Sequence, residues 1–259
     1  MVACFARFED RTDRLESAHA LVSRSIGLPE TDSLRVAGLA IARDVDHGIG
    51  AGVAAGYHNG QHFLEVMLTA LYLARLASFD PRRTARVATA ALIHDFHHDG
   101  SRGASSPFRL ELRAAQEAQS YLRAAGVDDD ECQRLQALVL ATDPSIGVPF
   151  ARAFWARHAA GEPAVPLAPT LPPPLGRMLL EPDLAYEAVL LAEADVLPSI
   201  GLTPEHAERL QSRLAIEWGA TLGRDDKLLF IDDIIGEIRV ASFFIPNILA
   251  LRQAYLGLK

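Results

Sequence analysis

The sequence of 259 residues is poor in cysteine and has no long apolar run. Its two cysteines, Cys4 and Cys132, form neither a disulfide framework nor the paired pattern of a cysteine zinc site. The nearest candidate for a membrane span, residues 240–251, is shorter than the roughly 18 to 20 residues required and is interrupted by Pro246. The first ten residues turn acidic at once, unlike a secretory signal. These absences predict a soluble, cytoplasmic protein that neither spans nor binds a membrane.

An excess of positive charge is also missing. The formal net charge is −8 and the isoelectric point is near 5.6. Because nucleic acid polymers and anionic membranes attract basic surfaces, this charge argues against either as a general partner.

Helical periodicity dominates the sequence, and no segment alternates as a half-buried strand does. With 49% hydrophobic residues in 259, the chain is long enough for one domain with a large core. We therefore predict an all-α fold in which residues 1–259 form a single compact multi-helix domain. The predicted helices cover approximately residues 13–26, 31–44, 59–77, 80–97, 108–125, 129–142, 184–196, 203–222 and 231–256. The apolar segment at the C-terminus is expected to complete the core, or a homodimer interface if the protein is not a monomer.

Residues 144–174 depart from the helical pattern because they are rich in proline. We expect a loop there, with a short helix at about 150–160. A loop of this length in a compact domain is typical of a lid, a partner-binding segment or a disordered excursion.

Two stretches carry residues suited to metal chemistry. In residues 88–100, an apolar helical run leads into His94 and Asp95, which are followed by two more histidines. Histidine supplies a neutral nitrogen ligand and aspartate an anionic oxygen, a mixture that divalent cations accept. Upstream, His58 and His62 are four residues apart and share a helix face if that segment is helical. We interpret the two stretches as halves of one metal site.

Four motifs together resemble the HD superfamily of metal-dependent phosphohydrolases, and within it the catalytic domain of class I 3′,5′-cyclic-nucleotide phosphodiesterases. They span residues 57 to about 232 and occur in the order of that family. The motifs are Tyr57-His58-Asn59-x-x-His62, His94-Asp95-Phe96-His97-His98-Asp99-Gly100, Ala141-Thr142-Asp143 and Ala194-Asp195.

The resemblance implies a site with two divalent metal ions, and Zn, Mg, Mn, Fe and Co are all compatible with such ligands. His58 would be the general acid that protonates the leaving alkoxide, and a metal-activated water would attack phosphorus. The implied ligands of the tightly held ion are His62, His94, Asp95 and Asp195, with Asp95 also bridging to the second ion. The implied residues around the second ion are His98, Glu111, Thr142 and Asp143.

The sequence departs from that family where the purine would bind. In residues 227–232, Phe230 keeps the stacking aromatic ring, but Lys227 stands in place of the family's glutamine. A lysine ammonium only donates hydrogen bonds, so it suits an anionic or carbonyl-rich group better than an adenine edge. We expect Phe230 and Lys227 to contact a small-molecule phosphate ester such as a nucleotide.

Several alternatives stay open. The same scaffold could serve a nucleotidase or triphosphohydrolase. It could also be a metal-bearing but inactive module that binds a nucleotide or a partner protein through residues 163–174. A di-iron oxygenase is a further possibility, because His97 supplies an extra imidazole. Residues expected on the surface, outside the site, are Arg82, Arg83, Arg86, His158 and His206.

Overall fold

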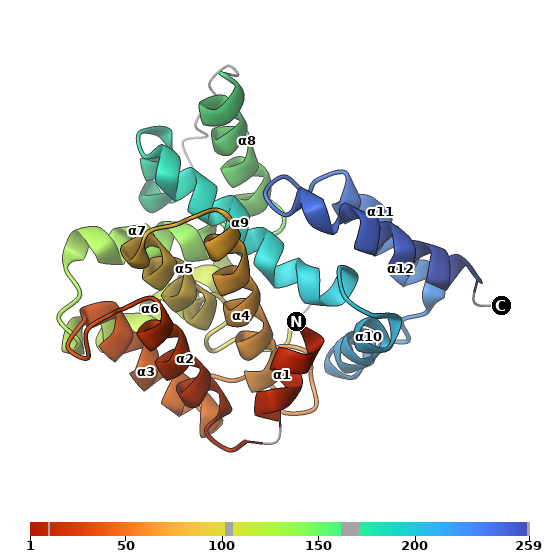
Figure 1. Ribbon diagram of the computed structural model, residues 1–259, viewed down its shortest axis with the longest axis horizontal. Coiled ribbons are helices and arrows are strands. Elements are labelled where there is room, and N and C mark those ends of the chain that lie inside the picture. Colours follow the sequence, from red (N-terminus) through yellow and green to blue (C-terminus); the bar gives the residue numbers. More distant parts are fainter. Residues whose placement is uncertain (10, 102–105, 162–170, 258–259) are drawn as a thin grey trace.

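The computed structural model describes residues 1–9, 11–101, 106–161 and 171–257, and all regular structure in these ranges is helical (Figure 1). This confirms the predicted all-α fold. The first half of the chain contains α1 (Val2–Glu9), α2 (Arg14–Ser25), α3 (Ser33–Asp46), α4 (Gly60–Leu76), α5 (Pro81–Ile93), α6 (Arg109–Ala124) and α7 (Asp129–Leu140). The second half contains α8 (Gly147–Ala160), η1 (Pro173–Leu179), α9 (Pro182–Ile200), α10 (Pro204–Trp218), α11 (Arg224–Ile235), η2 (Ser242–Phe244) and α12 (Ile245–Gly257).

Five of the described helices, α3, α4, α5, α7 and α10, begin at a residue whose side chain accepts a backbone N–H of the first turn. The Asp32 carboxylate accepts the backbone N–H of Leu34 at 3.0 Å at the start of α3. Asp80 caps α5, and Pro81 occupies a first-turn position where its missing N–H costs nothing. Thr203 caps α10 in the same way. Local chemistry therefore sets where these helices start.

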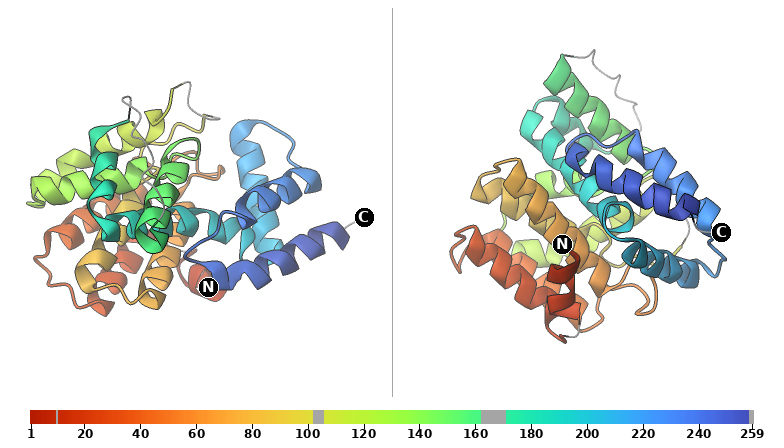
Figure 2. Two further views of the ribbon diagram at one scale, coloured as in Figure 1. Left: turned by 90° about the horizontal axis from the view of Figure 1, so that it is seen from above. Right: turned by 45° about the vertical axis from the view of Figure 1, so that its right-hand side comes forward.

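The centre of the fold is formed by α4, α5 and α9. α4 packs along both α5 and α9, α2 and α3 cover α4 and α5, and α7 and α8 pack against α9. α10, α11 and α12 gather at the C-terminal end of α9 (Figure 2). One cluster of buried apolar side chains includes residues from Leu15 to Tyr255. That residues 1–259 form a single domain stays a prediction.

The C-terminal prediction of one helix over 231–256 is wrong. α11 ends at Ile235, and α12 begins only at Ile245, so that Pro246 lies in a first turn. The intervening turn is held by the buried Glu193 carboxylate of α9, which accepts the backbone N–H groups of Arg239, Val240 and Ala241 at 2.6–3.0 Å. Because this anchor is distant in sequence, helical periodicity could not reveal it. One face of α12 does complete the core, as expected.

The proline-rich segment is more ordered than predicted. α8 is longer than the short helix expected at 150–160, and residues 173–179 form a 3₁₀ helix. Residues 162–170 of the predicted loop, which include most of the segment considered for partner binding, lie outside the described residues.

A buried ion network joins α5 to α7 and α9, contrary to the prediction that its arginines lie on the surface. Arg86 is 9% exposed, and its guanidinium pairs with Glu131 of α7 at 2.6 Å and with Glu187 of α9 at 2.8 Å. Arg83 also donates to Glu187, at 2.8 Å. The carboxylates that bury these arginines come from later helices.

Among the described helices, none is long and apolar enough to cross a membrane.

We predict that Glu187→Ala lowers the free energy of unfolding by about 3 kcal/mol, because it leaves Arg86 buried with only part of its counter-charge. Urea denaturation measures this difference. The matched control is Asp183→Ala, which removes an exposed partner of Arg83 and should cost less than about 1 kcal/mol. Similar losses in both variants would contradict the importance of the buried network.

Candidate metal centre

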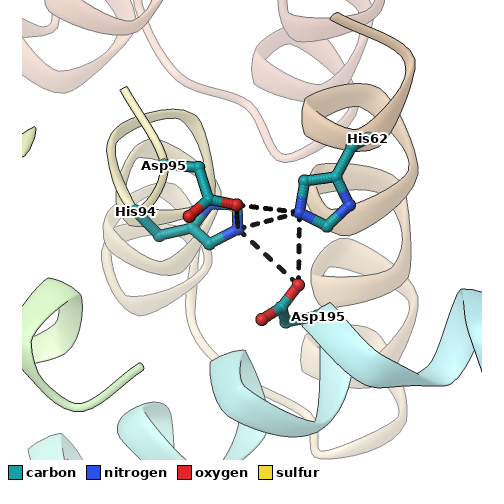
Figure 3. Close-up of side chains that lie close together, drawn as sticks. All are labelled: His62, His94, Asp95 and Asp195. Carbon is teal, nitrogen blue, oxygen red and sulfur yellow. Dashed lines mark hydrogen bonds and ion pairs between the residues drawn. The ribbon is translucent and has the colours of Figure 1, made fainter. Parts of the chain in front are cut away.

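The first half of the centre lies at the start of α4, where Asn59 fixes the backbone. The Asn59 side-chain oxygen accepts the N–H groups of Gln61 and His62, and its amide donates to the carbonyl of Gly56 at 2.7 Å. Asn59 thus ties the helix to the preceding loop. His62 is consequently held in the first turn, with its ring buried and directed towards α5 (Figure 3).

The second half lies where α5 ends. The helix stops at Ile93 rather than near residue 97 as predicted, because the chain turns sharply and His97 adopts a left-handed backbone with φ 63°. His94 is the last residue to make a helical hydrogen bond, to the carbonyl of Ala90. The C-terminus of a helix carries partial negative charge, so a cation is favoured beside His94 and Asp95.

Asp195 completes the cluster from the middle of α9. His62 Nε2 lies 3.0 Å from Asp95 Oδ2, 3.2 Å from His94 Nε2 and 3.3 Å from Asp195 Oδ1. His94 Nε2 lies 3.0 Å from Asp95 Oδ2. The four side chains predicted as ligands therefore meet at one point, and their donor atoms all lie within 4.8 Å of one another (Figure 3).

This donor set fits a divalent cation. Two ligand atoms bound at about 2.1 Å to one ion lie about 3.0 Å apart at a right angle and about 3.4 Å apart at a tetrahedral angle, close to the separations observed. His94 Nδ1 contacts the carbonyl of Ala91 at 3.0 Å. Because a carbonyl only accepts, Nδ1 carries a proton and the Nε2 lone pair of the neutral ring faces the cluster.

The electrostatics of the cluster demand positive charge. Burial disfavours the charged form of His62, but hydrogen bonds and charges from Asp195 and Asp95 outweigh it and raise its pKa to about 9. The pKa of His94 is likewise raised well above its usual value by the same carboxylates. Protons thus occupy a place that a divalent cation could take instead.

Beside this cluster, His58, Asp95 and His98 form a second group of donors within 4.8 Å of one another. The rings of His58 and His98 stack with centroids 3.8 Å apart. His98 Nδ1 accepts the backbone N–H of Gly100 at 3.0 Å, so its Nε2 carries the proton. In this tautomer His98 Nε2 is a hydrogen-bond donor and offers no lone pair to a cation.

Sequence reasoning missed Glu217, which is the direct partner of His58. This carboxylate comes from the end of α10, is buried, and accepts His58 Nδ1–H at 2.5 Å and the His58 backbone N–H at 2.9 Å. Burial opposes ionisation, but the contacts with His58 outweigh it and lower the pKa of Glu217. A lone glutamate 159 residues away in an amphipathic helix carries no local signal of this pairing.

The glycine-rich loop before α4 packs against both halves of the site. The N–H of Gly52 donates to the His58 carbonyl at 2.8 Å, and a Cβ at Gly52 would lie 2.3 Å from that oxygen. Gly50 adopts φ 71°, its carbonyl accepts the N–H of His97, and a Cβ there would strike the Phe96 ring. Only glycine permits this close approach.

The residues predicted around a second ion line one cavity together with metal donors, but their hydrogen-bond partners differ. Glu111 is buried, one of its oxygens has no hydrogen-bond partner, and burial together with Asp143 and Asp95 raises its pKa to about 7. The hydroxyl of Thr142 donates to a backbone carbonyl. Both oxygens of Asp143 accept backbone N–H groups, one of them at Phe108, the residue that precedes α6. Asp143 therefore positions the helix that carries Glu111.

A cavity of about 740 Å³ is lined by residues of both groups of donors and also by Lys227 and Phe230. Of the other histidines, His97 belongs to neither group of donors in the described part of the chain, and its ring packs against Phe96. His206 is buried rather than exposed, and its Nε2 lies 3.0 Å from a carboxylate oxygen of Glu65 in α4. The surface prediction for His206 is wrong for the same reason as that for the buried arginines, because its partner is distant in sequence.

No model of a known protein family and no curated protein matches this sequence. Solved structures do match it. LmjPDEB1, solved in complex with IBMX, aligns with a TM-score of 0.66 over 98% of this chain and 90% of its own, at 15% identity.

Two structures from the choanoflagellate Salpingoeca rosetta align similarly. The phosphodiesterase domain of the RhoPDE fusion protein has a TM-score of 0.66, covers 96% of this chain and 90% of its own, and is 19% identical. The phosphodiesterase domain of the rhodopsin phosphodiesterase has a TM-score of 0.64, with 96% and 88% covered, at 19% identity. These likenesses confirm the predicted phosphodiesterase-like fold.

Proposed function

We propose that the protein is a divalent-metal phosphohydrolase that cleaves a phosphate ester, with a phosphodiester as the expected substrate. The observation that carries the proposal is the meeting of His62, His94, Asp95 and Asp195 at one point of a cavity, next to a His58–Glu217 pair. The phosphodiesterase-like fold supports the same activity.

In this proposal the four converging side chains hold one cation, and Asp95 lies where it can also reach a second one beside His58 and His98. When bound, divalent cations supply Lewis acidity that activates water and polarises a phosphoryl oxygen. His98 donates a hydrogen bond through Nε2 to water or the phosphoryl group. Glu111, with its unpartnered buried oxygen, orders water in the same region.

His58 is proposed as the general acid. Glu217 accepts the Nδ1 proton, which fixes the ring and leaves Nε2 directed towards Asp95, 3.9 Å away, at the reacting end of the cavity. A protonated Nε2 can then pass its proton to the leaving alkoxide, and the nearby carboxylate stabilises the charged ring.

Lys227 and Phe230, which line the same cavity, are proposed to bind the remainder of the substrate. Among the described residues His97 belongs to neither group of donors, so it lends no support to the oxygenase alternative. A panel of cyclic, mono- and triphosphate esters separates the phosphodiesterase from a nucleotidase or triphosphohydrolase.

We predict that purified protein contains divalent metal and hydrolyses bis-p-nitrophenyl phosphate, and that chelation abolishes the activity reversibly. His94→Ala should lose both bound metal and activity, because it removes one of four ligands. Elemental analysis and absorbance assays measure the two. The control is His47→Ala, which removes an exposed imidazole at the end of α3 and should change neither. Stoichiometric metal in the His94 variant would refute the ligand set.

We predict that Glu217→Gln and His58→Ala slow hydrolysis of a diester with an alkyl leaving group by about a hundredfold to ten-thousandfold, the usual contribution of a general acid. The same variants should cleave a p-nitrophenyl ester with much smaller losses, because that leaving group departs as an anion without a proton. The kcat values for the two substrate types measure the contrast. Equal losses on both types would show that His58 has another role.

A further inference from the structure

Lys227 is an unusual residue for this chain. Lysine occurs only at positions 227 and 259, and the remaining basic side chains are all arginine. Yet Lys227 is 6% exposed and lies in the wall of the cavity that contains the metal donors. A lysine so placed is costly unless its donors are used.

The ammonium of Lys227 has few partners in the protein. Its Nζ donates to the carbonyl of Ser199 at 3.4 Å, and it forms no ion pair within the described part of the chain. The adjacent Asp226 carboxylate accepts the N–H of Gly223 at 2.7 Å. Burial alone lowers the pKa of Lys227 to about 8. Two of its three N–H groups are therefore available to a ligand in the cavity.

The surroundings of this amine favour a flat, apolar ligand. Lys227 Nζ lies 5.5 Å from the centroid of the Phe230 ring, which also lines the cavity. Leu214 and Leu222 contribute further apolar wall. An aromatic base stacked on Phe230 would bring its edge to Nζ, whereas a second phosphate would have to give up its hydration against apolar side chains.

Lys227 is connected to the metal donors through α9. Ser199, which holds Nζ, is one turn beyond Asp195 on α9, about 6 Å along the helix axis. A ligand whose phosphate lies at the metal donors can therefore place its base beside Lys227.

We propose that Lys227 selects a phosphate ester whose aromatic base presents adjacent oxygen and nitrogen acceptors, such as hypoxanthine or guanine, over one with an amino group there, such as adenine. The O6 and N7 atoms of a 6-oxopurine both accept, and lysine is a standard partner for them, whereas the adenine N6 group is a donor that would face another donor. The inference rests on the proposed phosphohydrolase function, and the experiments below keep the two apart.

The first test compares hydrolysis of cyclic IMP and cyclic AMP, which differ at C6. The wild-type protein should favour cyclic IMP in kcat/KM by about tenfold or more. Lys227→Gln should bring the ratio close to one, because an amide can present either a donor or an acceptor. Lys227→Met, which keeps the length and apolar stem, should also abolish the preference. Hydrolysis of bis-p-nitrophenyl phosphate, which has no base, by the wild-type protein measures phosphohydrolase activity separately from base selection.

The second test measures binding without metal or turnover. Protein labelled with ¹⁵Nζ-lysine has two side-chain ammonium groups, and Lys259→Gln assigns them. In EDTA, 5′-IMP should shift the Lys227 signal at concentrations about tenfold lower than 5′-AMP does. Lys259→Gln should leave the preference intact.

The outcomes separate the two proposals. Cleavage of the p-nitrophenyl ester without any preference for the 6-oxo base would overturn the role of Lys227 and leave the phosphohydrolase intact. A preference for IMP in binding, with no hydrolysis of any ester, would support the base site and overturn the proposed activity. The Lys227 signal also reports whether pyrophosphate displaces IMP. If it does, and IMP and AMP bind with equal affinities, Lys227 belongs to a second anion site and the inference is refuted.

Discussion

The structure depends on two half-buried carboxylates that face two buried imidazoles. Asp95 and Asp195 are brought against His62 and His94 from three different helices, in a place where an uncompensated charge would be strongly unfavourable. The four donor side chains can converge only if α4, α5 and α9 keep their positions. The requirement for positive charge between the carboxylates is what connects the fold to metal chemistry.

α9 is the element that holds this arrangement in place. Near its start, Glu187 binds the arginines of α5, and near its end Glu193 holds the turn between α11 and η2. Asp195 lies between these anchors and the carbonyl of Ser199 that contacts Lys227. A single helix thus carries both Asp195 of the metal donors and the carbonyl that holds Lys227, the residue proposed to select the base.

Sequence reasoning was accurate where structure is local. Caps such as Asp80 and the helical periods predicted the all-α fold, and the four motifs predicted which imidazoles and carboxylates meet. It failed where a partner is distant. Glu217 has no local signal, His206 and Arg86 were expected on the surface but are buried by carboxylates from other helices, and the helix predicted over 231–256 is divided because Glu193 holds its middle. Periodicity records the solvent-facing side of a helix, but not which later helix supplies the counter-charge.

The metal donors and the His58–Glu217 pair form one unit, because Asp95 belongs to both groups of donors. The most direct test is a crystal structure of the protein grown with manganese, with anomalous scattering measured to locate the ion. We predict an anomalous peak within about 2.3 Å of the donor atoms of His62, His94, Asp95 and Asp195. Crystals grown in saturating manganese that show no peak there, with the carboxylates still hydrogen-bonded directly to the two imidazoles, would contradict it.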